Sequence, residues 1–69
     1  MKISARNSLA GTVKHIKLGD VEAEVTIELA AGVEIVATIT RTSVETLGIA
    51  VGKPAFAIIK ASSVMVGVA

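Results

Sequence analysis

Residues Val21–Leu29 read VEAEVTIEL, and this stretch decides the fold because apolar and polar residues alternate in it without a break. A period of two places all of the apolar side chains on one face of a β-strand and all of the polar ones on the other. Three of the four polar positions are Glu, which predicts that the polar face lies in water. The stretch therefore predicts a strand that is buried on one side only.

The segments on either side of this strand predict two more. Ala30-Ala31-Gly32 has the composition of a hairpin turn, in which Gly32 adopts a positive φ easily, and Val33–Thr40 then returns as the partner strand. Upstream, Ser8–Leu18 alternates loosely, and Gly19-Asp20 marks the reversal into Val21. One face of this first strand is expected to carry Leu9, Gly11, Val13 and His15.

A short helix is expected after the third strand. Thr42-Ser43-Val44-Glu45 has capping-box spacing, with Thr42 as the N-cap and Glu45 three residues on, and the helix is expected to end before Gly48. Pro54 can begin the following strand but cannot lie inside one.

The C-terminal third is apolar on both faces. Ala55–Ile59 and Val64–Val68 do not alternate, which is typical of strands covered on both sides. Five short strands and one helix predict an all-β fold, a small OB-like barrel formed by a single domain, residues 1–69. An open sandwich of two sheets is the alternative.

Size and composition restrict the possible functions. In a chain of 69 residues, burial of apolar surface barely offsets the cost of ordering the backbone, yet 52% of the residues are hydrophobic and only one is aromatic. We therefore expect copies of the chain to bury apolar surface against one another. A net charge of +1 argues against a broad basic face for nucleic acid or membranes. With one His and no Cys, no cation site is expected, and the absence of a signal peptide or spanning segment favours the cytoplasm.

Two clusters of hydrogen-bond donors lie near the ends of the chain, Ser4-Ala5-Arg6-Asn7 and Lys60-Ala61-Ser62-Ser63, and neither contains a carboxylate. The second interrupts an apolar run, where buried charge and hydroxyls cost free energy unless they find partners. A tetrahedral oxyanion such as sulfate, molybdate or tungstate has only acceptor oxygens, so its site must consist of donors. The clusters predict such a site, with no organic cofactor. Taken alone, the first cluster is also compatible with an ordinary solvated terminus.

Four segments, in order along nearly the whole chain, resemble the molbindin (Mop) family, which consists of stand-alone TOBE-type domains. They are Ile3–Asn7, Ala23–Val25, Ser43–Glu45 together with Leu47-Gly48, and Ile59–Met65. The resemblance implies an OB-like barrel with strands exchanged between subunits, assembled as a homo-hexamer that is a trimer of dimers. It also implies that molybdate or tungstate is held at subunit interfaces, for molybdate storage and homeostasis in the cytoplasm.

The same resemblance assigns candidate residues. The principal site would combine Ser4, the backbone of Ala5, and Arg6 from one subunit with Lys60, the backbone of Ala61, and Ser62 from another. Asn7 and Ser63 are secondary candidates that would hold the loops in shape, and Thr40, Thr42 and Ser43 are candidates for further sites near a threefold axis. His15 departs from the family pattern, and we expect it to be a surface residue of its strand.

Other functions fit the sequence less well. An OB-type module that binds nucleic acid needs several aromatic platforms, and Phe56 is the only aromatic residue. An accessory module of a transporter or regulator would need a separate partner protein. No nucleophile with a neighbouring base and no cofactor loop can be recognised, so we do not expect an enzyme.

Overall fold

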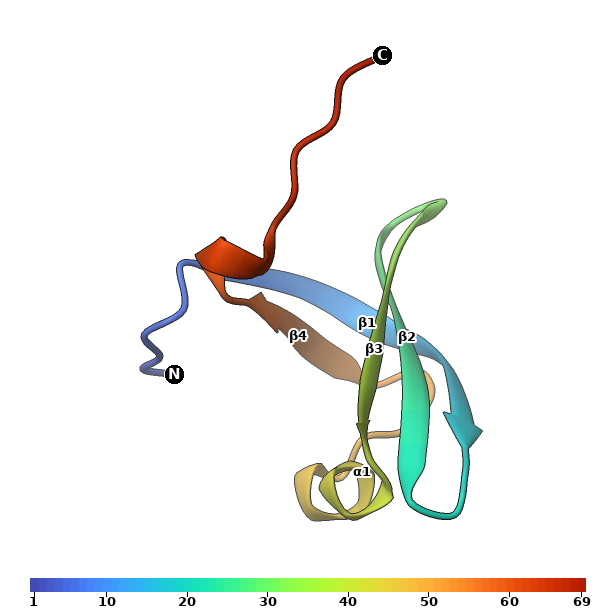
Figure 1. Ribbon diagram of the computed structural model, residues 1–69. Coiled ribbons are helices and arrows are strands. Elements are labelled where there is room, and N and C mark those ends of the chain that lie inside the picture. Colours follow the sequence, from blue (N-terminus) through green and yellow to red (C-terminus); the bar gives the residue numbers. More distant parts are fainter.

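The computed structural model describes residues 1–69 and shows a four-stranded antiparallel sheet with the order β3-β2-β1-β4, curled into a half-barrel with a short helix at one end (Figure 1). The predicted all-β fold with one short helix is confirmed. The elements are β1 (Asn7–Leu18), β2 (Glu22–Ala30), β3 (Val33–Thr40), α1 (Arg41–Leu47), β4 (Pro54–Ile59) and a 3₁₀ turn, η1 (Ala61–Ser63).

The alternation of β2 works as predicted. Ala23, Val25 and Ile27 are all buried, whereas Glu22 and Glu24 on the opposite face are exposed. Six residues make up the whole core: Val13, Ala23, Val25, Ile27, Val44 and Ala57. The turn into β3 also forms as expected, with Gly32 at φ 76°. So small a core leaves much apolar surface uncovered, including Phe56, which is 55% exposed.

A β-bulge in β1 changes which residues face the core. Val13 pairs with Ile27, but the next pair is His15 with Thr26, which leaves Lys14 as an extra residue. An extra residue shifts the alternation by one position. The prediction that His15 shares the face of Val13 is therefore wrong, because the bulge turns His15 to the exposed side.

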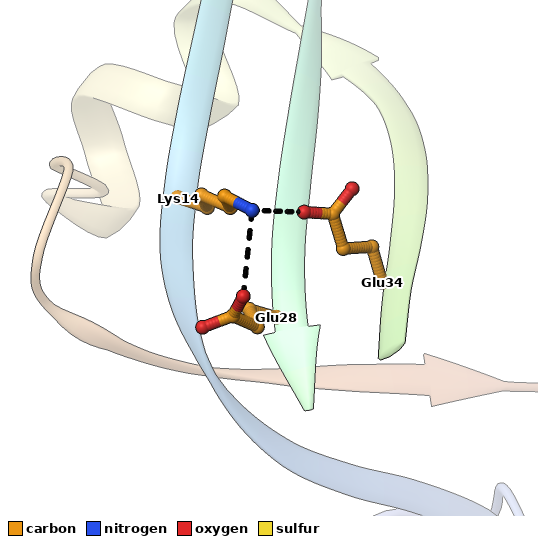
Figure 2. A network of polar contacts seen from close by, with 3 residues as sticks. All are labelled: Lys14, Glu28 and Glu34. Carbon is orange, nitrogen blue, oxygen red and sulfur yellow. Dashed lines mark hydrogen bonds and ion pairs between the residues drawn. The ribbon is translucent and has the colours of Figure 1, made fainter. Parts of the chain in front are cut away.

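The bulge residue, Lys14, also offsets the repulsion between two neighbouring carboxylates. Glu28 and Glu34 stand directly opposite each other in the β2–β3 ladder, where like charges destabilise a sheet. The Nζ of Lys14 lies 2.6 Å from Glu34 Oε2 and 3.4 Å from Glu28 Oε2, between the two carboxylates (Figure 2). Two hydrogen bonds raise the pKa of Lys14 above its ordinary value. The bond to Glu34 has the larger effect and the bond to Glu28 the smaller one.

The N-cap of α1 is Thr40 and not Thr42. Thr40 is extended, with φ −74° and ψ 151°, and its Oγ1 accepts a 3.0 Å hydrogen bond from the N–H of Ser43. The predicted capping box from Thr42 to Glu45 is wrong, because the last residue of β3 caps the helix and Thr42 lies within the first turn. The helix ends before Gly48 as predicted, and Gly48 has the left-handed φ of 65°.

The predicted fifth strand does not form within one chain. Residues Val64–Val68 pair with no strand, and Met65, Val66 and Val68 are at least 90% exposed. Figure 1 shows this tail, in red, running from η1 away from the sheet. A strand requires a partner edge, and the tail reaches none in its own chain, so this part of the prediction is wrong for the single chain.

The structure has no helix with the length and apolar composition needed to span a membrane.

Candidate anion-binding site

Pairing between β1 and β4 brings the two ends of the chain together. The ladder closes at Asn7, which stands opposite Ile59, and the Asn7 side-chain amide donates a 3.3 Å hydrogen bond to the Ile59 carbonyl. The residues that precede Asn7 and those that follow Ile59 must then lie side by side. Figure 1 shows the N-terminal segment, in blue, next to η1 at that end of the sheet.

Between these segments lies a pocket of about 550 Å³. Its lining consists of Ser4, Ala5, Arg6, Ile58, Lys60, Ala61 and Ser62. All six principal residues from the sequence therefore line one pocket, and Ile58 is the only addition. The resemblance divided the two clusters between subunits, whereas here they already meet within one chain, because β1 and β4 of that chain pair with each other.

The pocket is electropositive and rich in donors. Arg6 and Lys60 both line it, neither forms an ion pair with a carboxylate, and no Asp or Glu belongs to the lining. In η1, the N–H groups of Ser63 and Val64 donate hydrogen bonds to the carbonyls of Lys60 and Ala61, respectively. The N–H groups of Ala61 and Ser62, two residues of the pocket lining, have no acceptor within this turn.

The secondary candidates lie outside this pocket. Asn7 ties the ends of β1 and β4 together, and Ser63 is exposed in η1. Thr40, Thr42 and Ser43 lie at the beginning of α1, at the other end of the molecule from η1 (Figure 1). There the Thr40 hydroxyl donates a 2.7 Å hydrogen bond to Ser43 Oγ. The side chains of Thr40 and Ser43 therefore bond to each other at the beginning of the helix.

Ile58 is the pocket residue that sequence reasoning missed. It precedes Lys60 by two positions, and Lys60 directly follows β4 with an extended backbone, so the two side chains are expected on the same side. That spacing was the available signal.

Comparison with known proteins identifies the family. Residues 3–66 match the model of the TOBE domain. The chain belongs to the TOBE domain family. A probable molybdenum-pterin-binding protein of Haemophilus influenzae is 52% identical to this TOBE domain over 68 residues, which is 99% of each chain. The molybdenum transport protein ModE of Azotobacter vinelandii is also 52% identical, over 94% of this chain but only 24% of its own length.

Solved structures agree with the sequence relatives. MopII from Clostridium pasteurianum superposes with a TM-score of 0.90 at 43% identity, covering 97% of this TOBE domain and all of MopII. The cytoplasmic molybdate-binding protein ModG, in a form with molybdate bound, gives a TM-score of 0.93 at 49% identity, over all of this chain and 49% of ModG. The resemblance to the Mop family and the OB-like fold are thereby confirmed.

Proposed function

We propose that this TOBE domain binds molybdate, and also tungstate, in the pocket between its two terminal donor clusters. One observation carries the proposal: the six residues selected from the sequence as oxyanion donors line a single pocket. Its lining includes two positively charged side chains, Arg6 and Lys60, and no carboxylate. Relatives named for molybdate or molybdenum-pterin binding support it, including one solved with molybdate.

The mechanism is binding rather than catalysis. Arg6 and Lys60 offset the two negative charges, and the guanidinium fork of Arg6 can donate two parallel hydrogen bonds to neighbouring oxygens. The hydroxyls of Ser4 and Ser62, with the backbone amides near Ala5 and Ala61, would fill the remaining directions. We further propose that no organic cofactor takes part and that molybdate and tungstate bind in preference to sulfate and phosphate.

Isothermal titration with molybdate, tungstate and sulfate at one ionic strength tests this proposal. We expect saturable binding of the first two and markedly weaker binding of sulfate. Absence of molybdate binding, or equal affinity for sulfate, would contradict it.

We also propose that copies of the chain assemble, as a hexamer built from dimers, with anion sites at their interfaces and with strands exchanged. The support is an apolar groove of about 480 Å³ lined by 13 residues, all hydrophobic, from β2, β3, β4 and the segment from Leu47 to Ile49. Phe56 and Ile58 on this groove are 55% and 47% exposed. The apolar tail Val64–Val68 has no partner in its own chain, so a second copy could use it to cover the groove.

Native mass spectrometry with and without molybdate tests the assembly. The intact chain is expected as a hexamer carrying anions, and a chain ending at Ser63 is expected to lose that assembly. A monomer at micromolar concentration for the intact chain would contradict the proposal.

In the cell, such a protein would store molybdate and maintain its supply in the cytoplasm, where ModG is described. A second candidate is an anion-sensing module of a longer protein, which is favoured by the match to about a quarter of ModE. Measurement of the total molybdenum that cells retain after transfer to molybdate-free medium separates the two, because deletion of the gene should shrink that pool if the protein is a store and leave it unchanged if the protein is a sensing module. No observation favours nucleic-acid binding, since Phe56 lies in the apolar groove.

A further inference from the structure

Ile58 gives the pocket an apolar wall. It is the only lining residue with a large hydrocarbon side chain, since the others are serines, alanines and the two cations. Its place is fixed by the β1–β4 ladder, in which it stands opposite Ser8, and a β-branched side chain has few rotamers to choose from. The wall is therefore a defined surface and not a flexible one.

Ile58 is also shared by two cavities. It lines both the anion pocket and the apolar groove on β4, and no other residue lines both. Ile58 thus presents hydrocarbon to both cavities, and the residue is 47% exposed in the single chain, so an anion that enters the pocket displaces water from this surface. An anion in the pocket would meet donors on most sides and hydrocarbon on this one.

We infer that Ile58 is a specificity-determining residue that separates molybdate from sulfate by desolvation, an inference that rests on the proposed molybdate function. An oxygen facing Ile58 loses water and gains no hydrogen bond in return. The desolvation penalty grows as an ion of given charge becomes smaller, and sulfate is the smaller tetrahedral dianion. The wall therefore weakens sulfate binding more than molybdate binding, in addition to any limit set by size.

The test replaces hydrocarbon with a hydroxyl at nearly constant shape. Ile58→Thr places a donor in the wall, and Ile58→Val is the matched control, because Val is similar to Thr in shape but remains apolar. Molybdate and sulfate are titrated calorimetrically into wild type and both variants at one ionic strength. Native mass spectrometry of each variant verifies that all three have the same assembly.

We expect Ile58→Thr to lower the ratio of the dissociation constant for sulfate to that for molybdate by about threefold or more. The reason is that the new hydroxyl can donate a hydrogen bond to the charged acceptor. Ile58→Val should leave the ratio within roughly 1.5-fold of wild type, because its wall is still apolar. An unchanged ratio in Ile58→Thr, or an equal change in both variants, would overturn the inference while leaving molybdate binding intact. Failure of the wild type to bind molybdate would instead refute the proposed function.

Discussion

Replacement of Arg6 by Ala is expected to weaken molybdate binding by about two orders of magnitude. Arg6 lines the pocket, forms no ion pair and can direct two charge-assisted hydrogen bonds at one anion. Because Arg6 is exposed, each bond is taken at the lower end of its range, about 1.5 kcal/mol, giving roughly 3 kcal/mol or a factor of about 100. Isothermal titration measures the loss directly.

Arg41 provides the matched control. It is also an exposed arginine, but it lies at α1, where its Nε is 3.7 Å from Glu45 Oε1 and its Nη1 donates to the Gly19 carbonyl. Arg41→Ala should leave molybdate affinity within about twofold, since surface charges outside a site act weakly through solvent. If Arg6→Ala and Arg41→Ala reduce affinity equally, or if neither does, the assigned role of Arg6 is refuted.

Three further predictions concern stability, measured by urea unfolding. A Cβ at Gly11 would lie 2.6 Å from the backbone oxygen of Glu28, so Gly11→Ala should lower the free energy of unfolding by about 1–3 kcal/mol, and an unchanged value would contradict the close approach. Thr40→Ala should cost about 1 kcal/mol through loss of the N-cap, whereas Thr42→Ala should cost clearly less, and the reverse order would restore Thr42 as the cap. The pKa of Lys14 is raised above 10.5 in the folded state, so its stabilising contribution is fully present below pH 10.5 and is lost as pH rises through the raised value. Lys14→Met should not show that alkaline loss, and parallel pH profiles would contradict the ion-pair assignment.

Local patterns predicted what local physics determines. The alternation of Val21–Leu29 identified β2 and its buried face, and Gly32 and Gly48 marked the turn and the helix end. The bulge at Lys14 left a signal that the alternation analysis did not use: two consecutive polar residues, Lys14 and His15, separate Val13 from Ile16, which shifts the apolar alternation by one position. The position of His15 was misjudged for that reason.

The errors at the helix and the tail have different causes. Thr40 and Thr42 both offer a capping hydroxyl, and only the point at which β3 ends decides between them. The tail Val64–Val68 has the composition of a strand, but a strand exists only when its hydrogen-bonding partner is present. Composition cannot reveal that such a partner is missing from the same chain.

The candidate site was predictable in its residues but not in its architecture. The donor clusters were visible because they are polar, lack carboxylates and, near Lys60, interrupt an apolar run. That Asn7 pairs with Ile59 is a contact between residues 52 positions apart, which no local pattern encodes. Ile58 escaped notice because an apolar residue in a strand looks like packing until its neighbours in space are known.

The most direct measurement is an anomalous difference map at the molybdenum absorption edge, from crystals of the protein grown with molybdate. The pocket between Arg6 and Lys60 should contain a molybdenum peak, with Ser4 and Ser62 directed at its oxygens. A map in which this pocket is empty while molybdenum occupies another place, or none, would contradict the assignment of the two terminal clusters as an oxyanion site.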